Sequence, residues 1–315
     1  MHRPTFRQPL DADHVLLLIN PRAGRRSIRR KADRLLELLA HKGGYTVEVC
    51  SDLLAACRQA NQWHAEGCLR AMVIMGGDGT VSDVVNRTEP GMPLAIFPGG
   101  TSNLIARHLR MEATPEFLFQ TIAAGRVLRM DAGRAAGRLF VAMASCGFDA
   151  EVVRRVHDLR QACRGGFLGY WSYVKPILDC TRSYQYPELR VHCDASYDGP
   201  AADPSAAITA RWAFVHNLPN YGWGLPIAPW TDETDGLLDL CTLGRGSLAA
   251  GLWYVAAIHL GIHRRLADCT TRPVRRVRIT AETDVVYQLD GDPVGHLPLD
   301  IEVVPGRMSV LLPAR

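Results

Sequence analysis

The stretch Ala71-Met-Val-Ile-Met-Gly-Gly-Asp-Gly-Thr80 decides the fold of the first half of this 315-residue chain. Five apolar residues run directly into a glycine-rich turn, and the residues that follow carry valines at helical spacing. A short, continuously apolar run is typical of a strand that is covered on both faces, as the strands of parallel sheets are. The stretch therefore predicts a strand, a turn and a helix of an α/β domain.

Two similar stretches lie on either side of it. An apolar run at 15–19 leads into Asn20-Pro-Arg-Ala-Gly24, and another at 94–97 leads into Pro98-Gly-Gly-Thr-Ser-Asn103, where Thr101 is expected to cap a helix. In a parallel sheet such turns meet at the carboxyl ends of the strands, where helix N-termini and backbone N–H groups bind anions. We therefore expect this edge of the sheet to hold the phosphates of a nucleotide.

The rhythm of the sequence changes beyond about residue 128. Strand-like segments now follow one another with few helices between them, which predicts a second, mostly antiparallel β domain. The exceptions are a helical zone at about 149–183 and an apolar helix at 247–262. That apolar run is interrupted by His259 and is shorter than the roughly 20 residues that a membrane span needs.

The composition excludes several classes of protein. A net charge of +4 with 22% charged residues is ordinary for a soluble chain and argues against a dedicated nucleic-acid binder, although it suits contact with an anionic membrane. The nine cysteines show no C-x-x-C spacing, which speaks against a zinc ribbon or redox pair and favours free thiols in a reducing cytoplasm. We expect a cytoplasmic protein that binds no nucleic acid.

The usual nucleotide fingerprints are absent from the glycine-rich turns. G-x-x-x-x-G-K-[ST] does not occur, and Gly77-x-Gly79 lacks the third glycine of a dinucleotide site because position 82 is serine. The turn still offers glycines that let phosphate approach the backbone, the Thr80 hydroxyl, and the Asp78 carboxylate, which can hold Mg²⁺ directly or through water. One Gly-Asp-Gly is common in turns, but three such loops on parallel strands favour a functional site.

Taken together, these loops resemble the catalytic-domain signature of the diacylglycerol kinase family, which includes bacterial lipid kinases and the sphingosine and ceramide kinases. The second half continues the resemblance in the family's order, through Met130-Asp-Ala-Gly133, Gly147-Phe-Asp-Ala150, Asp235-Gly-Leu-Leu-Asp239 and Leu289-Asp-Gly-Asp-Pro293. The resemblance implies an NAD kinase/diacylglycerol kinase-like α/β parallel-sheet domain at 14–128 and an antiparallel β-sandwich lipid-substrate domain at 129–305. A last strand at 306–315 would return to the first domain.

The activity implied by the resemblance is an ATP- and Mg²⁺-dependent transfer of a phosphoryl group to the hydroxyl of a diacylglycerol-like or sphingoid lipid. Its partners would be the lipid and, transiently, the inner membrane surface, with a role in phospholipid synthesis; a homodimer is left open. The residues that the resemblance places at ATP are Asn20, Pro21, Arg22, Ala23, Gly24, Ser51, Gly76, Gly77, Asp78, Gly79, Thr80, Val81, Ser82 and Thr101.

Acidic residues in the second half complete the expected site. Transfer to a hydroxyl needs a carboxylate that orients or deprotonates it, so both Asp290 and Asp292 are catalytic candidates beside Asp78. The family usually has Asp-Gly-Glu here, and the alternative is a plain Asp-Gly turn. Asp232, Asp235 and the Leu237 carbonyl resemble the family's structural Mg²⁺ loop, with a solvated acidic turn as the alternative.

Two other functions remain open. Departures from the family pattern at Asp83, Leu104 and Asp292 leave room for a catalytically silent nucleotide- or lipid-binding regulator. A soluble-substrate kinase of the NAD kinase type shares Gly-Gly-Asp-Gly but should carry an Asn-Glu pair that this sequence lacks. The aromatic pair Trp253-Tyr254 fits an acyl-chain slot, a membrane interface or an ordinary core.

Overall fold

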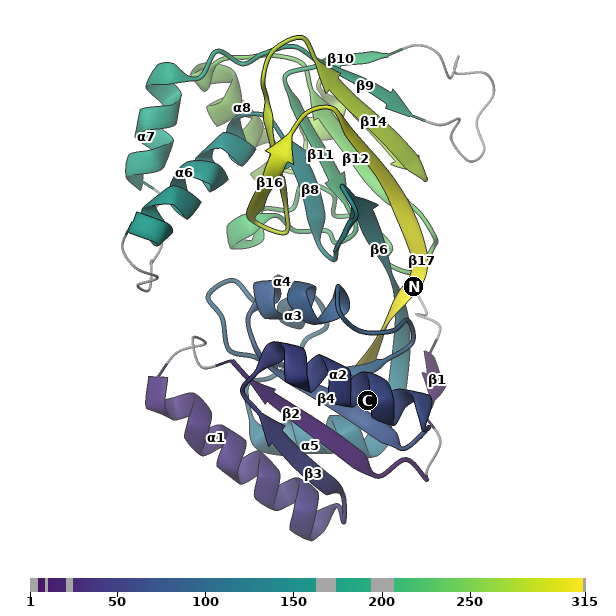
Figure 1. The fold of residues 1–315 in the computed structure, drawn as a ribbon. Helices are drawn as coiled ribbons and strands as arrows, with labels where there is room; N and C mark the ends of the chain where they lie inside the picture. The colour runs from purple at the N-terminus through teal and green to yellow at the C-terminus, as the bar shows by residue number, and fades with distance from the viewer. Residues whose placement is uncertain (1–4, 9–10, 21–24, 163–173, 194–206, 314–315) are drawn as a thin grey trace. The chain divides into compact units, whose positions relative to one another are not determined.

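The computed structural model describes residues 5–8, 11–20, 25–162, 174–193 and 207–313 (Figure 1). The chain divides into two compact units. One comprises Met1–Ala132 and Pro305–Arg315, and the other comprises Gly133–Val304.

Four parallel strands in the order β5-β4-β2-β3 form the centre of the first unit. Their bounds are β2 His14–Ile19, β3 Thr46–Cys50, β4 Leu69–Gly76 and β5 Pro93–Pro98. All eight residues of β4 are buried, as expected for a strand covered on both faces. The apolar run at 71–75 therefore belongs to a buried core strand of an α/β domain.

Helices connect these strands. Their bounds are α1 Arg25–Glu37, the π-helix η1 Leu38–Lys42, α2 Leu53–Ala65, α3 Asp78–Val85, α4 Leu104–His108 and α5 Pro115–Ala124. Helix α2 contacts β2, β3 and β4, whereas α5 contacts β5 and α1 (Figure 1). A short strand, β1 Thr5–Arg7, pairs antiparallel with the start of β6 Arg126–Ala135.

Strand β17, Leu299–Leu312, contributes to both units. Its first residues pair antiparallel with β14 in the second unit, and Ser309 and Val310 pair in parallel with Pro93 and Leu94 of β5 in the first. Met308, Val310 and Leu311 are almost completely buried. The last strand of the chain is thus part of the core of the N-terminal unit.

The second unit is an antiparallel β-sandwich. One sheet has six strands in the order β13-β12-β11-β8-β15-β16, and the other contains β10-β9-β14-β17 with β6 and β7. The strand bounds are β7 Arg138–Phe140, β8 Met143–Cys146, β9 Leu189–Cys193, β10 Ile208–Ala210, β11 Trp212–His216, β12 Leu238–Leu243, β13 Cys269–Val274, β14 Arg276–Ala281, β15 Val286–Leu289 and β16 Asp292–His296. The predicted fold class, a parallel-sheet α/β domain followed by an antiparallel β-sandwich, is confirmed.

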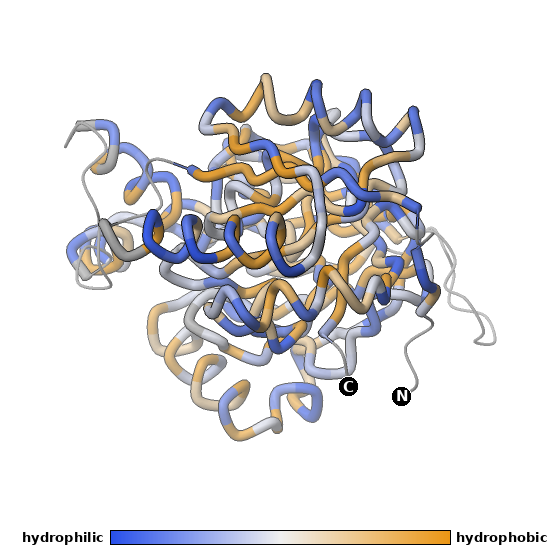
Figure 2. Tube along the Cα trace, turned by 90° about the horizontal axis from the view of Figure 1, so that it is seen from below, coloured by the Kyte–Doolittle hydropathy of each residue, from blue (hydrophilic) through white to orange (hydrophobic). Residues whose placement is uncertain are grey.

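The core of the sandwich is filled by alternate residues of both sheets. Val215 and Leu240 from one sheet and Val191, Ile279 and Ile301 from the other belong to a single buried apolar cluster. Figure 2 colours the trace by hydropathy and shows orange, hydrophobic segments running through the interior. Three helices complete the unit: α6 Phe148–Ala162, α7 Val174–Ser183 and α8 Leu248–His259. Two 3₁₀ turns, η3 Gly222–Gly224 and η4 His263–Arg265, lie in its loops.

Candidate functional site

The loops predicted to bind nucleotide all follow parallel strands of the first unit. Asn20 follows β2, Ser51 follows β3, Gly76 ends β4, and Thr101 lies in the loop after β5. Because the four strands run in the same direction, these positions share one edge of the sheet. Ser51 is exposed and stands on the outer strand, two strands away from Gly76. Pro21, Arg22, Ala23 and Gly24 lie outside the described residues.

The loops after β4 and β5 touch through their glycines. A Cβ on Gly100 would lie 2.6 Å from the Cα of Gly77, and the Gly99 N–H donates to the Gly76 carbonyl at 2.9 Å. Such backbone contact leaves no room for a side chain. The glycines at 77 and 100 are therefore required to hold the two loops against each other.

Gly79 differs from these glycines because the space beside it is open. Among the residues that the structure describes, a Cβ built at this position meets no heavy atom within 4 Å. The residue is exposed in the first turn of α3, where backbone N–H groups lack intrahelical partners and attract anions. This turn accordingly has the free space and the donors that a phosphate group needs.

Asp78 is tied into the fold of the first unit. One carboxylate oxygen accepts the N–H of Leu104 at 3.0 Å, and the other accepts that of Ile105 at 3.2 Å. The pKa of Asp78 is raised, chiefly by burial, while these backbone hydrogen bonds oppose the rise. The side chain therefore caps α4 from the first turn of α3, whatever further role it has in binding.

Thr101 does not cap that helix, and the expectation that it would is wrong. Helix α4 begins at Leu104, and its N-cap residue is Asn103 in the left-handed region, at φ 47°. The Asn103 side chain binds both the N–H and the carbonyl of Gly100, each at 2.8 Å. The cap that Thr101 was expected to supply comes from Asp78, which is distant in the sequence.

The remaining described residues that were predicted at ATP are buried or hydrogen-bonded within the first unit. Asn20 donates to the Thr80 hydroxyl at 2.8 Å and so joins the turn after β2 to the start of α3. The side chains of Val81 and Ser82 are almost completely buried. The Ser82 hydroxyl has no hydrogen-bond partner within the part of the chain that the structure describes.

Asp290 and Asp292 of the second unit have different surroundings. Asp290, in the left-handed region at φ 52°, accepts three successive backbone N–H groups, from Val141 at 2.7 Å, Ala142 at 2.8 Å and Met143 at 3.1 Å. Both of its oxygens are engaged in holding this loop. Asp292, at the start of β16, has a side chain that is 43% exposed, and its Oδ2 pairs with Arg138 at 3.0 Å.

A buried polar network reaches the turn between these two aspartates. The Ser145 hydroxyl donates to Asp149 and accepts from Gln288 Nε2 at 2.7 Å, and Gln288 Oε1 accepts the N–H of Gly291 at 2.7 Å. Gln288 and Ser145 are almost completely buried. Burial raises the pKa of Asp149 to about 6, although the Ser145 hydrogen bond opposes this rise. The network connects a buried acid to the Asp290-Gly291-Asp292 turn.

Comparison with known proteins decides the family. The family model for the diacylglycerol kinase catalytic domain matches residues 14–135, and the model for the YegS C-terminal NAD kinase beta sandwich-like domain matches 142–312, more than half of the chain. The chain belongs to the diacylglycerol kinase family. A protein named diacylglycerol kinase from Mycobacterium tuberculosis is 28% identical over 306 residues, which cover 95% of each chain.

Solved structures agree with this fold. A crystal structure of a diacylglycerol kinase from Bacillus anthracis aligns with a TM-score of 0.65 at 19% identity over 95% of this chain and 97% of that one. An NAD kinase from Archaeoglobus fulgidus, solved in complex with ATP, aligns with a TM-score of 0.52 at 12% identity over 95% and 93% of the two chains. The family thus shares its two-part architecture with NAD kinases.

The predicted magnesium loop of this family member is compact. Asp232 accepts from the Thr234 N–H and hydroxyl at 3.0 and 2.7 Å, and Asp235 accepts the Leu237 N–H at 2.9 Å. The pKa of Asp235 is raised, first by burial and also by the charges of Asp232 and Glu233. Within the described ranges no three acidic, histidine or cysteine side chains gather around one metal position, so carbonyl and water oxygens would have to complete a site here.

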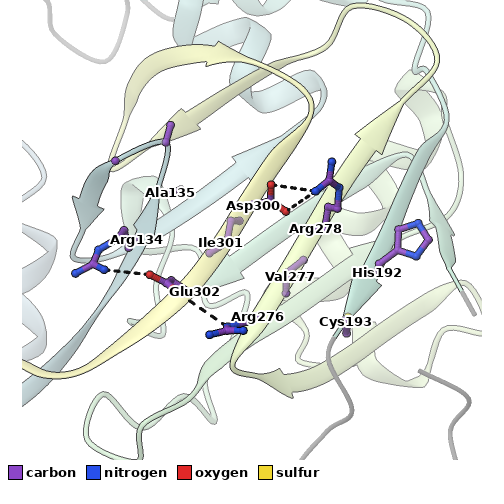
Figure 3. Close-up of a pocket in the computed structure, with 12 residues that line it drawn as sticks. Arg134, Ala135, His192, Cys193, Arg276, Val277, Arg278, Asp300, Ile301 and Glu302 are labelled. Carbon is purple, nitrogen blue, oxygen red and sulfur yellow. Dashed lines mark hydrogen bonds and ion pairs between the residues drawn. The ribbon is translucent and has the colours of Figure 1, made fainter. Parts of the chain in front are cut away.

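One surface pocket of the second unit is lined by none of the predicted site residues among those that the structure describes. It has a volume of about 490 Å³ and is lined by β14, β17 and their neighbours (Figure 3). Its arginines are paired with carboxylates, Arg134 with Glu302 at 3.1 Å and Arg278 with Asp300 at 3.3 Å. Because these charges largely neutralise each other, we assign no ligand to the pocket.

Sequence reasoning missed the roles of Asp149 and Gln288. Asp149 stands in Gly147-Phe-Asp-Ala150, which carried part of the family resemblance, but only the fold shows that this carboxyl is enclosed and joined to Ser145. Gln288 lies between apolar residues of β15. A polar residue inside an apolar strand was the one available signal, because a buried amide must find hydrogen-bond partners.

The raised pKa of Asp149 predicts a pH-dependent stability. The folded protein holds this proton more tightly than the unfolded chain, so the contribution of Asp149 to the free energy of unfolding falls as pH rises through about 4 to 6. We expect a loss of about 2 kcal/mol between about pH 4 and pH 7, which Asp149→Asn removes. Urea unfolding of the wild type and of Asp149→Asn across this pH range measures the loss. Parallel pH profiles of the free energy of unfolding would contradict the role assigned to Asp149.

Proposed function

We propose that this chain is an ATP-dependent lipid kinase that transfers the γ-phosphoryl group of ATP to a lipid hydroxyl. The observation that carries the proposal is the space that the described residues leave open at Gly79, whereas a Cβ would meet the Thr80 side chain at Gly76 and the Gly100 backbone at Gly77. Nucleotide kinases of other designs place a lysine at such loops, but the described loops of this chain offer backbone N–H groups and the Thr80 hydroxyl instead. Membership in the diacylglycerol kinase family supports a phosphotransferase reaction.

ATP and Mg²⁺ fit the residues that are present. The turn at Gly76, Gly77 and Gly79 with Thr80 would hold the nucleotide phosphates. Asp232, Asp235 and the Leu237 carbonyl would supply the hard oxygen ligands that Mg²⁺ prefers. When bound, ATP supplies the phosphoryl group and the leaving ADP, and a Mg²⁺ bound with the nucleotide, distinct from the structural ion at 232–237, would offset the negative charge of the phosphates.

Asp292 is the residue that we assign to the acceptor hydroxyl. Asp290 uses both of its oxygens to bind three backbone N–H groups, whereas Asp292 is partly exposed and keeps Oδ1 outside its pair with Arg138. As the lipid oxygen bonds to the γ-phosphorus of ATP, the bond between that phosphorus and ADP breaks. The proton of the lipid hydroxyl passes to Asp292. The positive charge of Arg138 orients this carboxylate, which directly follows Gly291, the last residue of the network from Asp149.

The lipid substrate implies contact with a membrane. Among the described residues no helix is long and apolar enough to cross a bilayer. We therefore propose a transient peripheral association with an anionic inner membrane surface, which the net charge of +4 favours.

Labelled ATP tests the proposed reaction. Purified protein is incubated with γ-labelled ATP, Mg²⁺ and either diacylglycerol, sphingosine or NAD, and the products are separated. A labelled lipid is the expected result and identifies the acceptor. Labelled NADP would instead indicate the NAD kinase type, and retained ATP binding without any labelled product would indicate a silent regulator.

The magnesium site can be tested without measuring activity. A ligand that binds only the folded protein raises its stability, by about 3 kcal/mol at a concentration of about 100 times its Kd. We expect Mg²⁺ to raise the Tm of the wild type but not that of Asp235→Asn. Because the substitution removes a charge held near Asp232 and Glu233, the variant should be at least as stable as the wild type when Mg²⁺ is absent. An equal rise in the Tm of both proteins would exclude this loop as the Mg²⁺ site. Asp300→Asn is the control variant.

A further inference from the structure

Helix α8 of the second unit exposes an apolar surface. Four large apolar residues of the helix are exposed, Leu248 by 45%, Leu252 by 65%, Trp253 by 46% and Val255 by 45%. Leu260, directly after the helix, is 68% exposed. The other exposed positions of the helix are alanines, apart from His259. A helix that is apolar on all sides is normally enclosed by protein or by lipid. We call these five residues the α8 surface.

The helix is nevertheless firmly attached to the sandwich. Ser247 caps its start by accepting the Ala250 N–H at 3.1 Å. On the inner side, the buried Tyr254 donates to Asp268 at 2.5 Å and accepts the Arg245 N–H at 2.8 Å. The α8 surface is thus the outward side of an ordered element, and Tyr254 is the half of the Trp253-Tyr254 pair that packs in the core.

Cations border the α8 surface at both ends. Residues 240–267 contain no aspartate or glutamate. The arginines of this segment are all exposed, with Arg245 before the helix and Arg264 and Arg265 just after it. Arg264 lies over the ring of Trp230 at 4.3 Å, and Arg245 pairs with Asp268 at 3.2 Å. An apolar face with basic residues at its margins is the pattern of helices that lie in the interface of an anionic bilayer.

A second copy of the chain is a poorer match for this surface. Two identical helices that meet about a two-fold axis either run antiparallel, which sets Arg245 of one against Arg264 and Arg265 of the other, or run parallel, which sets like residues together. Either arrangement brings cations against cations. An anionic lipid surface attracts all of them, and tryptophan is favoured at the level of the head groups.

We propose that the α8 surface and its flanking arginines dock the protein on an anionic lipid bilayer. The helix lies in the plane of the membrane, with Leu252, Trp253 and Leu260 at the boundary between head groups and acyl chains. The inference rests on the proposed function in so far as a lipid kinase must reach a substrate held in a bilayer. Docking itself requires neither ATP nor catalysis.

Sedimentation with lipid vesicles tests the docking. The full chain is mixed with vesicles of phosphatidylcholine alone or of phosphatidylcholine with phosphatidylglycerol. We expect it to bind the anionic vesicles preferentially and less tightly as salt is raised. Leu252→Asp should weaken this binding about tenfold, because a carboxylate would enter the interface. Leu54→Asp, at a position 56% exposed on α2, is the matched control.

Further measurements separate the docking from the other possibilities. If Leu252→Asp leaves vesicle binding unchanged, the proposal is overturned, and loss of a dimer in size-exclusion chromatography would then assign the surface to a second copy. Phosphorylation of a short-chain, water-soluble diacylglycerol should be equal in wild type and Leu252→Asp. Vesicle binding that depends on Leu252 in a protein without kinase activity would uphold the docking and refute the proposed function.

Discussion

Replacing Asp292 by asparagine is expected to lower kcat for lipid phosphorylation by about 10²- to 10⁴-fold, the usual contribution of a general base. Its side chain is partly exposed, and its described partner is Arg138. Asparagine can still accept from that guanidinium but cannot take the proton of the hydroxyl. KM for ATP and the Tm should change little, because neither depends on this carboxylate.

Asp300→Asn is the matched control for this experiment. Asp300 is also paired with an arginine of the same unit, Arg278, but it lies on a different sheet in the pocket of Figure 3. This substitution should leave both kcat and Tm unaltered. Full activity in Asp292→Asn would refute the assignment of the base.

Asp290→Asn separates the two aspartates by stability. Three backbone N–H groups converge on the Asp290 carboxylate, and an amide side chain has one acceptor oxygen with which to replace two. A buried donor left without a partner costs about 1–3 kcal/mol. We expect Asp290→Asn to lower the free energy of unfolding by about that amount, with any loss of activity following from the disturbed loop at 141–143. A stable but inactive Asp290→Asn would reverse the two roles.

The second large effect is expected at Gly79. A methyl group there meets no heavy atom of the described residues within 4 Å, and alanine favours a helix over glycine by about 0.5–1 kcal/mol, so Gly79→Ala should fold and gain slightly in stability. The same methyl group would occupy the space that we assign to phosphate. We expect ATP binding, measured by calorimetry, to weaken at least about tenfold, which corresponds to about 1.4 kcal/mol.

Gly100→Ala is the counterpart with the opposite outcome. Its methyl group would lie 2.6 Å from the Cα of Gly77, so the two loops must move apart and stability should fall. A comparison of Tm with ATP affinity therefore distinguishes a glycine that gives room to a ligand from one that gives room to the backbone. If ATP binds Gly79→Ala as tightly as it binds the wild type, phosphate does not approach this turn.

The candidate residues of the two units were predictable to different degrees. The apolar run at 71–75 predicted a buried strand because removing its apolar side chains from water stabilises the fold. The glycine loops followed from their positions after such strands. The acidic positions could be named as candidates, but the division between Asp290 and Asp292 depends on three N–H groups that lie about 150 residues earlier in the chain, as their separations of 147 to 149 show.

Tertiary contacts also explain why the prediction of a helix cap at Thr101 was wrong. The capping rule favoured Thr101 because a hydroxyl near a helix start usually binds its first N–H groups. In the folded chain the Asp78 carboxylate binds the first N–H groups of α4, and a carboxylate is a stronger acceptor than a hydroxyl. Asp78→Ala is accordingly a poor test of catalysis, since it removes the cap of α4 together with any role in binding.

The shared strand β17 constrains the order in which this protein can be made. Ser309 and Val310 complete the parallel sheet of the first unit by pairing with β5, although more than 170 residues of the second unit stand between them and Ala132. A ribosome produces these residues only after the whole second unit. The nascent N-terminal unit therefore leaves the exit tunnel with the β5 edge of its sheet uncovered, and it acquires this strand only after the second unit has been synthesised.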